Sequence, residues 1–168
     1  MLTNTKESLE KFRRFVAQQS RSRLSKGKKN DSKGLYKKLG GVLKVSPNSF
    51  KLSWDLGYGT FQDKGVSGTE KKYNTPYSYK SKMPPISPLA DWAKRKGIRL
   101  RDDKGKFQKG NYKTIGFLIA RSIQKKGLKP SLFFTKPFEQ GFKKLPDELI
   151  EAYGLDIEEF LQFTLNKR

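Results

Sequence analysis

The chain has 168 residues, of which 34% are apolar, and its 37 Lys and Arg outnumber 16 Asp and Glu to give a formal net charge of +21. It contains no Cys and no His, which excludes disulfides, thiolate nucleophiles and the usual zinc ligands, and removes the side chain best suited to proton transfer at neutral pH. No stretch approaches the 18 consecutive apolar residues of a membrane span, and the N-terminus lacks the apolar region of a secretory signal, so we expect neither a membrane anchor nor secretion.

The charge is unevenly distributed along the chain. Residues 1–40 carry twelve basic and three acidic side chains, residues 63–113 carry fourteen and five, and residues 114–145 carry seven and one. Only residues 146–168 are acidic, with six acids and two bases. An anionic partner relieves self-repulsion of this size, and nucleic acid is the commonest such partner. The alternative is a solvated surface that keeps an assembly subunit soluble before it docks.

The first predicted element is a helix over residues 4–24. Asn4 with Glu7 fits a capping box, and Phe12 and Val16 lie on one apolar stripe. The opposite face and the following loop carry the cations that we interpret as candidate nucleic-acid-facing residues, with an ordinary solvated helix face as the alternative. These candidates are Arg13, Arg14, Arg21, Arg23, Lys28 and Lys29.

An antiparallel hairpin is predicted next, with its turn at Pro47-Asn48-Ser49. Its second strand has apolar residues at every other position from Phe50 to Tyr58, which is typical of a half-buried strand. The glycines that follow, Gly65 and Gly68, permit backbone angles closed to other residues. We therefore expect an arm whose glycine tip reaches a neighbouring subunit; a flexible hairpin end is the alternative.

Residues 66–85, "VSGTEKKYNTPYSYKSKMPP", predict a long loop. Interleaved Tyr and Lys can stack on bases and pair with phosphates, but they suit a protein interface equally well, and we favour the interface. The candidate subunit-interface residues of the arm and this loop are Tyr58, Phe61, Gly65, Gly68, Lys72, Tyr73, Tyr77 and Tyr79.

The second half of the chain predicts mainly helices. A short helix begins with Ser87 as its cap and ends at Gly97, with Trp92 facing the core. A polar, hairpin-like loop separates it from a helix over residues 111–126 that Asn111 caps.

Two further helical segments are predicted, over residues 147–153 and 156–165. The second has its own capping signal in Asp156 with Glu159.

The sequence gives little support to catalysis, and we assign no catalytic, cofactor-binding or metal-binding residues. The stretch "GYGTFQ" lacks the third glycine of the dinucleotide fingerprint. Asp102, Asp103 and Lys104, with Asp91 upstream, are the carboxylates and lysine that a metal-dependent nuclease would need. The run "DDKGK" is more simply a polar turn.

Several stretches in this order resemble bacteriophage tail-completion proteins of the head–tail joining, or neck, group. "SKGLYKKLGGVLKV" resembles their Thr-Gly-x-Leu-x-x-Ser-Ile strand entry, and "LGYGTFQDKGVSG" resembles their Tyr-Ala-x-Phe-Val-Glu-x-Gly-Thr stretch. "MPPISPLADWAKRKGI", "TIGFLIARSIQKKGLKPSLFF" and "KPFEQGF" resemble their tryptophan helix, the next helix and the aromatic closing segment. The likeness covers roughly residues 30–140.

The resemblance implies an α+β subunit with a twisted antiparallel sheet packed by the long N-terminal helix and central helices, with long loops. The helical C-terminal extension is predicted from the residues themselves and has no clear counterpart in that group. We expect a basic helix and loop over residues 1–30, a core domain over 31–145 and an acidic extension over 146–168.

The function that the resemblance implies is structural. The chain would be a subunit of a homo-oligomeric ring, a hexamer or a dodecamer, that lies in the virion between portal and tail. This ring stabilises the DNA-filled head and allows tail attachment. The implied partners are the portal, other neck or tail proteins and packaged DNA in the channel, with assembly in the host cytoplasm and no catalysis, cofactor or membrane. The alternative function is a free-standing, non-specific nucleic-acid-binding protein.

Overall fold

The computed structural model describes residues 2–27, 33–46 and 49–166, and it confirms the mixed α+β class. The chain is 56% helix, and the described residues form seven helices and two small antiparallel sheets of two strands each. Four residues that carry sequence-based predictions lie outside the described part: Lys28, Lys29, Pro47 and Asn48.

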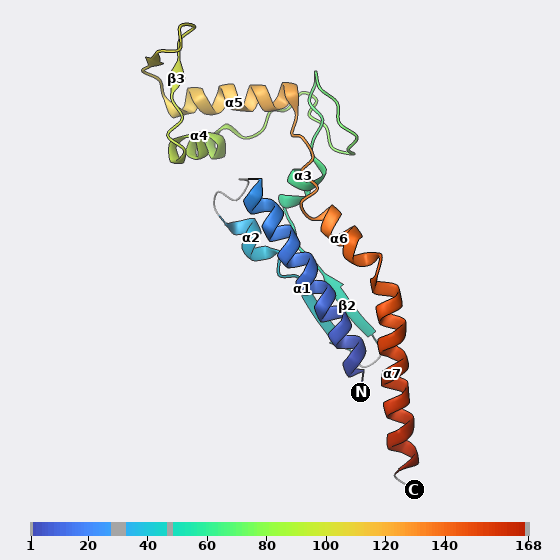
Figure 1. The fold of residues 1–168 in the computed structure, drawn as a ribbon. Helices are drawn as coiled ribbons and strands as arrows, with labels where there is room; N and C mark the ends of the chain where they lie inside the picture. Colours follow the sequence, from blue (N-terminus) through green and yellow to red (C-terminus); the bar gives the residue numbers. More distant parts are fainter. Residues whose placement is uncertain (1, 28–32, 47–48, 167–168) are drawn as a thin grey trace. The chain divides into compact units, whose positions relative to one another are not determined.

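The chain divides into two compact units (Figure 1). Unit 1 combines Met1–Asp63 with Leu132–Arg168, and unit 2 is Lys64–Ser131. The sequence-based boundaries after residues 30 and 145 differ from this division. The reason is that the first and last helices pack on each other and so belong to the same unit.

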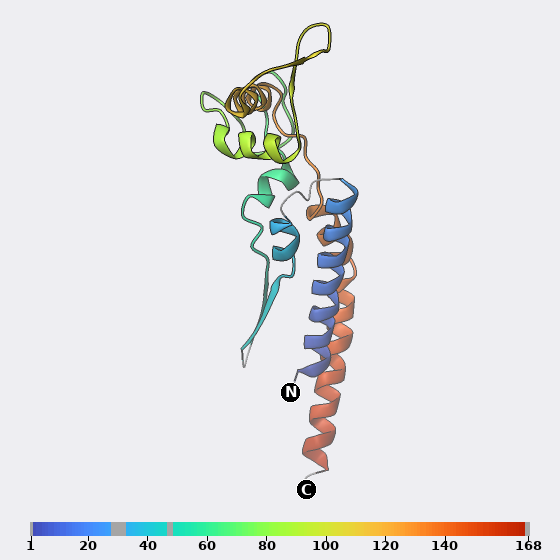
Figure 2. The same ribbon diagram turned by 90° about the vertical axis from the view of Figure 1, so that its left-hand side faces the viewer.

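Unit 1 is built on two long helices, α1 (Thr3–Lys26) and α7 (Leu145–Leu165), which lie side by side (Figure 2). The predicted helix over residues 4–24 is confirmed as α1. Its apolar stripe places Phe12 and Val16 against Leu145 at the start of α7 in a buried cluster. The two C-terminal helices predicted at residues 147–153 and 156–165 are one continuous helix, because no residue between them breaks the hydrogen-bond ladder.

The first hairpin packs on α1 through an aromatic cluster. After the short helix α2 (Gly34–Lys38), strands β1 (Val42–Ser46) and β2 (Ser49–Ser53) pair from Ser46 with Ser49, which confirms the predicted hairpin. Just past β2, Trp54 makes edge-on contacts with Phe12 and with two aromatic residues near the helix α6 (Thr135–Phe142). Those two residues are Phe134 and Phe138.

Gly41 makes room for the indole. Its φ is +65°, and a Cβ at this position would lie 2.5 Å from Trp54 Nε1. A side chain here would therefore displace the tryptophan as well as strain the backbone.

The predicted strand is wrong beyond Ser53, and so is the extended arm. Gly57 turns the chain with a φ of +48°, and the next residues form helix α3 (Gly59–Lys64). At its end, the buried carboxylate of Asp63 accepts hydrogen bonds from the backbone N–H of Phe134 and from Thr135. Asp63 thereby caps the N-terminus of α6. The segment that was expected to extend as an arm is instead held by contacts inside unit 1.

Unit 2 centres on α4 (Ile86–Arg95) and α5 (Tyr112–Lys126), the two helices predicted there. They approach closely at Gly116, where a Cβ would lie 2.8 Å from the carbonyl oxygen of Ile86. Asn111 caps α5 as predicted, because its side chain accepts a hydrogen bond from the N–H of Lys113. Helix α4 begins after Pro85 without a side-chain cap from Ser87.

Trp92, which was predicted to face the core, is half-buried, and the next residue, Ala93, is fully buried. The polar loop between the helices forms a second hairpin, β3 (Leu100–Arg101) with β4 (Phe107–Gln108).

The long loop after α3 is fastened to the C-terminus of α5. The N–H groups of Thr69 and Glu70 donate to the last carbonyls of α5, at Gln124 and Lys125. Gly68 lies so close to this helix end that a Cβ would fall 2.1 Å from the carbonyl oxygen of Lys125. Gly68, the second glycine of "GVSG", thus permits close backbone packing inside unit 2.

Replacing Trp54 by Ala should lower the free energy of unfolding by about 3–5 kcal/mol, because the substitution removes the ring shared by α1, β2 and α6. Chemical denaturation followed by circular dichroism measures this change. Tyr58→Ala is the matched control, since Tyr58 is 87% exposed and its loss should leave stability nearly unchanged. Equal stability of the two variants would contradict the role of Trp54 in the core.

Candidate functional site

Asp156 fixes the position of α7 against α1. One carboxylate oxygen accepts a hydrogen bond from the backbone N–H of Asn4 at 2.9 Å, and the other accepts from the N–H of Thr5 at 2.9 Å and from its hydroxyl at 2.6 Å. The carboxylate therefore satisfies N–H groups at the start of α1 that the helix itself leaves open, and it lies at the positive end of the helix dipole. Asn4, which the sequence predicted as the cap, is instead a donor to Asp156.

The pKa of Asp156 reflects these contacts. Burial alone raises the pKa of this carboxyl group, since it is 2% exposed. The hydrogen bonds from Thr5 and Asn4 outweigh burial and hold the pKa below its ordinary value. The folded structure therefore favours the charged carboxylate of Asp156 over the protonated form.

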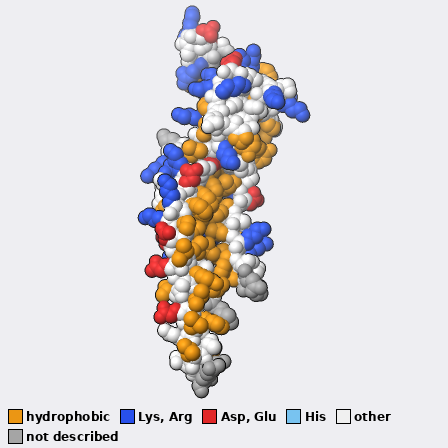
Figure 3. Space-filling model, turned by 90° about the vertical axis from the view of Figure 1, so that its right-hand side faces the viewer, with side chains coloured by type: hydrophobic (Ala, Val, Ile, Leu, Met, Phe, Trp, Pro, Cys, Tyr) orange, Lys and Arg blue, Asp and Glu red, His pale blue; other side chains and the backbone are white. Residues whose placement is uncertain are grey.

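An apolar stripe runs along the exposed side of α7. Ile150, Tyr153, Ile157, Phe160 and Leu161 follow one another at spacings of mostly three or four residues, which places them on one face of the helix. All five are exposed, from 42% for Ile157 to 74% for Ile150. In Figure 3, hydrophobic side chains gather in a band along the face on which α7 lies. We call these five residues the α7 stripe.

Acidic residues occupy the other exposed side of α7. The helix contains six Asp and Glu and no Lys or Arg, in a chain whose net charge is +21. At the helical period, Glu151 and Glu158 lie roughly opposite the α7 stripe. Helix α7 therefore presents an apolar face and an acidic face, and it is the acidic element of a basic protein.

A groove of about 590 Å³ lies between α1, α6 and the acidic side of α7. Phe15, Gly141 and Leu155 contribute to its apolar wall, and Glu148 and Lys144 to its polar one. The hydroxyl of Ser8 also lines the groove and has no hydrogen-bond partner among the described residues.

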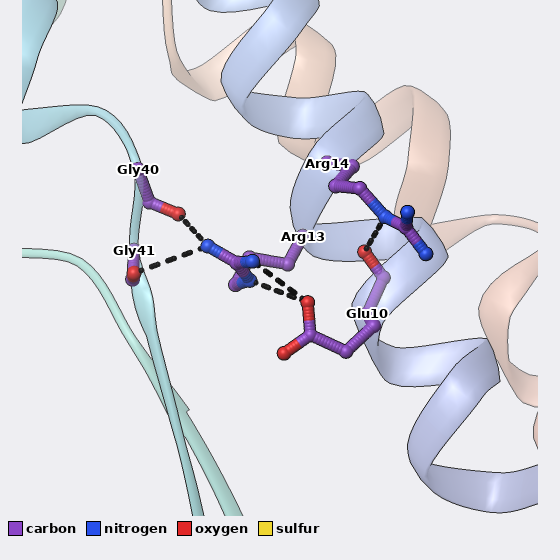
Figure 4. A network of polar contacts seen from close by, with 5 residues as sticks. All are labelled: Glu10, Arg13, Arg14, Gly40 and Gly41. Atoms are coloured by element: carbon purple, nitrogen blue, oxygen red, sulfur yellow. Dashed lines mark hydrogen bonds and ion pairs between the residues drawn. The ribbon is translucent and has the colours of Figure 1, made fainter.

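The arginines predicted to face nucleic acid are partly engaged within unit 1. Arg13 donates a hydrogen bond of 2.7 Å to the carbonyl of Gly40 and forms an ion pair of 2.7 Å with Glu10 (Figure 4). It joins α1 to the segment that leads into β1. Arg14 is exposed and donates to the backbone carbonyl of Glu10.

Arg21 is likewise bound to its own unit. Its Nε donates to the backbone carbonyl of Tyr36 at 3.1 Å, and its guanidinium lies 5.1 Å from the centre of the Tyr36 side-chain ring. Arg23 is half-buried. The nucleic-acid role of these arginines stays a prediction. Arg13 and Arg21 also join α1 to the segment of residues 36–40 through hydrogen bonds to its backbone.

The predicted interface residues of the arm occupy two different settings. Tyr58 and Phe61 pack ring to ring at 6.0 Å around the start of α3 and are exposed. Gly65 and Gly68 are buried within unit 2, where Gly65 packs against Leu128 and Pro130. Tyr58 and Phe61 are thus exposed residues of unit 1, whereas the two glycines are buried residues of unit 2.

The predicted interface residues of the loop fold back onto unit 2. Lys72 donates to the carbonyl of Gly68 at 2.9 Å, and the backbone N–H of Tyr73 donates to the hydroxyl of Ser67. Tyr77 and Tyr79 are half-buried, and burial raises the pKa of Tyr79. Their assignment to a subunit interface stays a prediction.

The sequence reasoning missed the α7 stripe, although the signal was present. Ile150, Tyr153, Ile157 and Phe160 recur at helical spacing on a different side from the core positions Leu145, Leu149 and Ala152. A helix with two apolar faces needs two partners.

No protein-family model, curated protein or solved structure matches the chain. Among the described residues, no group of three or more acidic side chains is placed to hold a metal ion. No helix within residues 2–27, 33–46 and 49–166 has the length and apolar character needed to cross a membrane.

Asp156→Asn should destabilise the pairing of α1 with α7 by about 1–3 kcal/mol, because an amide replaces a charged acceptor of several hydrogen bonds. Since the folded-state pKa is lowered, the stabilisation is complete above the ordinary carboxyl pKa of about 4 and is lost as the pH falls through the lowered value. Unfolding should be measured by circular dichroism at neutral pH and through this acid range.

The parent protein should lose its advantage over Asp156→Asn in acid. Glu158→Gln is the matched control, since it removes the same charge from an exposed site two residues away on α7. If the two variants were equally stable at neutral pH, the capping role of Asp156 would be wrong.

Proposed function

We propose that the chain is a structural virion protein of a tailed bacteriophage, a ring subunit of the neck that lies between portal and tail. The observation that carries the proposal is the α7 stripe, a row of large apolar side chains exposed to solvent in unit 1. Exposed apolar surface of this extent marks an interaction site in a monomer. The resemblance of residues 30–140 to neck proteins supplies the class of assembly.

A second copy of the chain is the partner that we propose for the stripe. Helix α7 carries six acidic and no basic residues, whereas the rest of the chain is strongly basic. A neighbouring copy therefore offers opposite charge around an apolar contact, which favours association and fixes its direction. Because an acidic helix meets a basic surface elsewhere on the next copy, the contact is head-to-tail, and such contacts form a ring when the rotation from one copy to the next closes.

The finer fold expectation belongs to this proposal. The resemblance implies one twisted antiparallel sheet packed by α1 and the central helices. In the structure β1 pairs with β2 and α1 packs beside them, and we propose that this hairpin supplies two strands of the larger sheet. In the ring, strands of a neighbouring copy extend the hairpin by edge pairing.

Ile157→Asn should weaken self-association by about tenfold or more, because a polar amide would be buried in the centre of the stripe. Sedimentation or light scattering across a dilution series measures the dissociation constant. Leu155→Asn is the matched control: Leu155 is 47% exposed on the same helix but lies on the side opposite the stripe. Its self-association should equal that of the parent.

Two results would contradict the proposal. The first is a parent protein that stays monomeric at all concentrations, both alone and with the portal. The second is antibody labelling of tailed particles from the genome that encodes the chain, if the label is absent from the head–tail junction. Rings in negative-stain images together with labelling at that junction would support it.

A further inference from the structure

Unit 2 concentrates the positive charge of the protein. Residues 64–131 contain eighteen Lys and Arg and four Asp and Glu. Half of these cations fall within residues 94–113, which run from the end of α4 through the β3–β4 hairpin to the start of α5 and contain two acids. Residues 94–113 are thus the most strongly charged stretch of a strongly charged unit, and the hairpin lies in the middle of this stretch.

One face of the hairpin gathers cations around an exposed aromatic ring. Arg101 pairs with Phe107 across the two strands, and its guanidinium lies 4.3 Å from the ring centre. The guanidinium of Arg99 lies 5.7 Å from the same ring, and Phe107 is 61% exposed. Lys109 lies just beyond the end of β4, two residues after Phe107. Cation–π contacts hold two guanidiniums close together in spite of their repulsion.

The acids of this segment do not neutralise that face. Asp102 accepts hydrogen bonds from the backbone N–H groups of Lys104 and Lys106 and so stabilises the turn, which confirms the polar turn predicted from "DDKGK". Asp103 lies in the exposed turn and not on the strands. Neither Arg99 nor Lys109 forms an ion pair with any described residue.

We propose that this hairpin face, Arg99, Arg101, Phe107 and Lys109, binds the phosphate backbone of duplex DNA. Guanidinium groups match phosphate oxygens in geometry as well as charge, and a two-stranded ribbon has the width of the major groove. Phe107 positions the arginines, since its ring is already in contact with both. The face therefore recognises phosphates and not unstacked bases.

The inference concerns residues that the sequence reasoning did not select. That reasoning placed nucleic acid at the arginines of α1, of which Arg13 and Arg21 bond to the backbone of unit 1. Within the described part of the chain, Arg101 is the one hairpin cation whose side chain donates a hydrogen bond to the backbone, and its acceptor is the carbonyl of Gly105 in its own turn. DNA binding by unit 2 does not require the ring, so the two proposals can fail separately.

The test is a titration of the full chain with a fluorescent DNA duplex at several salt concentrations, read by anisotropy. The triple variant Arg99→Gln, Arg101→Gln and Lys109→Gln should reduce the slope of log affinity against log salt by about 2.7, which is about 0.9 for each lost phosphate contact. The matched control removes three exposed lysines of unit 1 by Lys37→Gln, Lys44→Gln and Lys51→Gln. It changes the net charge equally and should leave the slope unchanged.

Three outcomes would overturn the inference. They are an unchanged slope in the triple variant, an equal loss of slope in the control, and binding of polyglutamate or single-stranded DNA as tight as that of the duplex. Polyglutamate distinguishes nucleic acid from an acidic protein partner. Self-association of the parent protein is measured under the same conditions, so a failed ring and a failed DNA site give different results.

A second variant protects the test against misfolding. Lys109→Gln alone removes one cation of the proposed face without touching the contacts of Phe107. Its circular dichroism melt should match the parent, and its salt slope should fall by about 0.9. A folded variant with the parent's slope would overturn the assignment of Lys109 to the DNA-binding face.

Discussion

The pairing of α1 with α7 through Asp156 is the constraint on which unit 1 depends. A helix N-terminus needs acceptors for its open N–H groups, and α1 obtains them from a residue about 150 positions away along the chain. The contact sets the register of the two helices, so that Phe12 and Val16 meet Leu145 and the aromatic cluster forms beside them. The same register turns the α7 stripe outward, because the core positions of α7 are already occupied.

Charge is divided between the elements of the protein in a way that fits an assembly subunit. The acidic residues cluster on α7, whereas residues 64–131 are strongly basic. Like charge within unit 2 raises the free energy of the isolated chain, and an anionic partner lowers it again. The apolar stripe supplies attraction at short range, while the opposite charges give direction to the approach.

The sequence predicted the elements that obey local rules. Helix α5 follows from the Asn111 cap and its apolar period, and the first hairpin follows from period-two alternation. It did not predict contacts between distant segments. Asp156 with Glu159 resembles a local cap, yet the acceptor serves α1, and Gly68 resembles a flexible tip, yet it packs against Lys125. Such partners depend on tertiary geometry, which no local pattern encodes. The α7 stripe could be predicted from residue spacing alone, provided that the helix was tested for a second apolar face.

The division of unit 1 into two stretches of chain has a consequence for biosynthesis. Residues 64–131 leave the ribosome as one continuous piece and can complete their fold at once. The first 63 residues must wait, because Leu145 and Asp156 complete their core and their helix cap. A product truncated before residue 145 would carry a finished basic unit and an unfinished α1, whose apolar stripe stays open to chaperones and proteases. Quality control during translation would thus act on the N-terminal helix, although the missing residues lie at the other end.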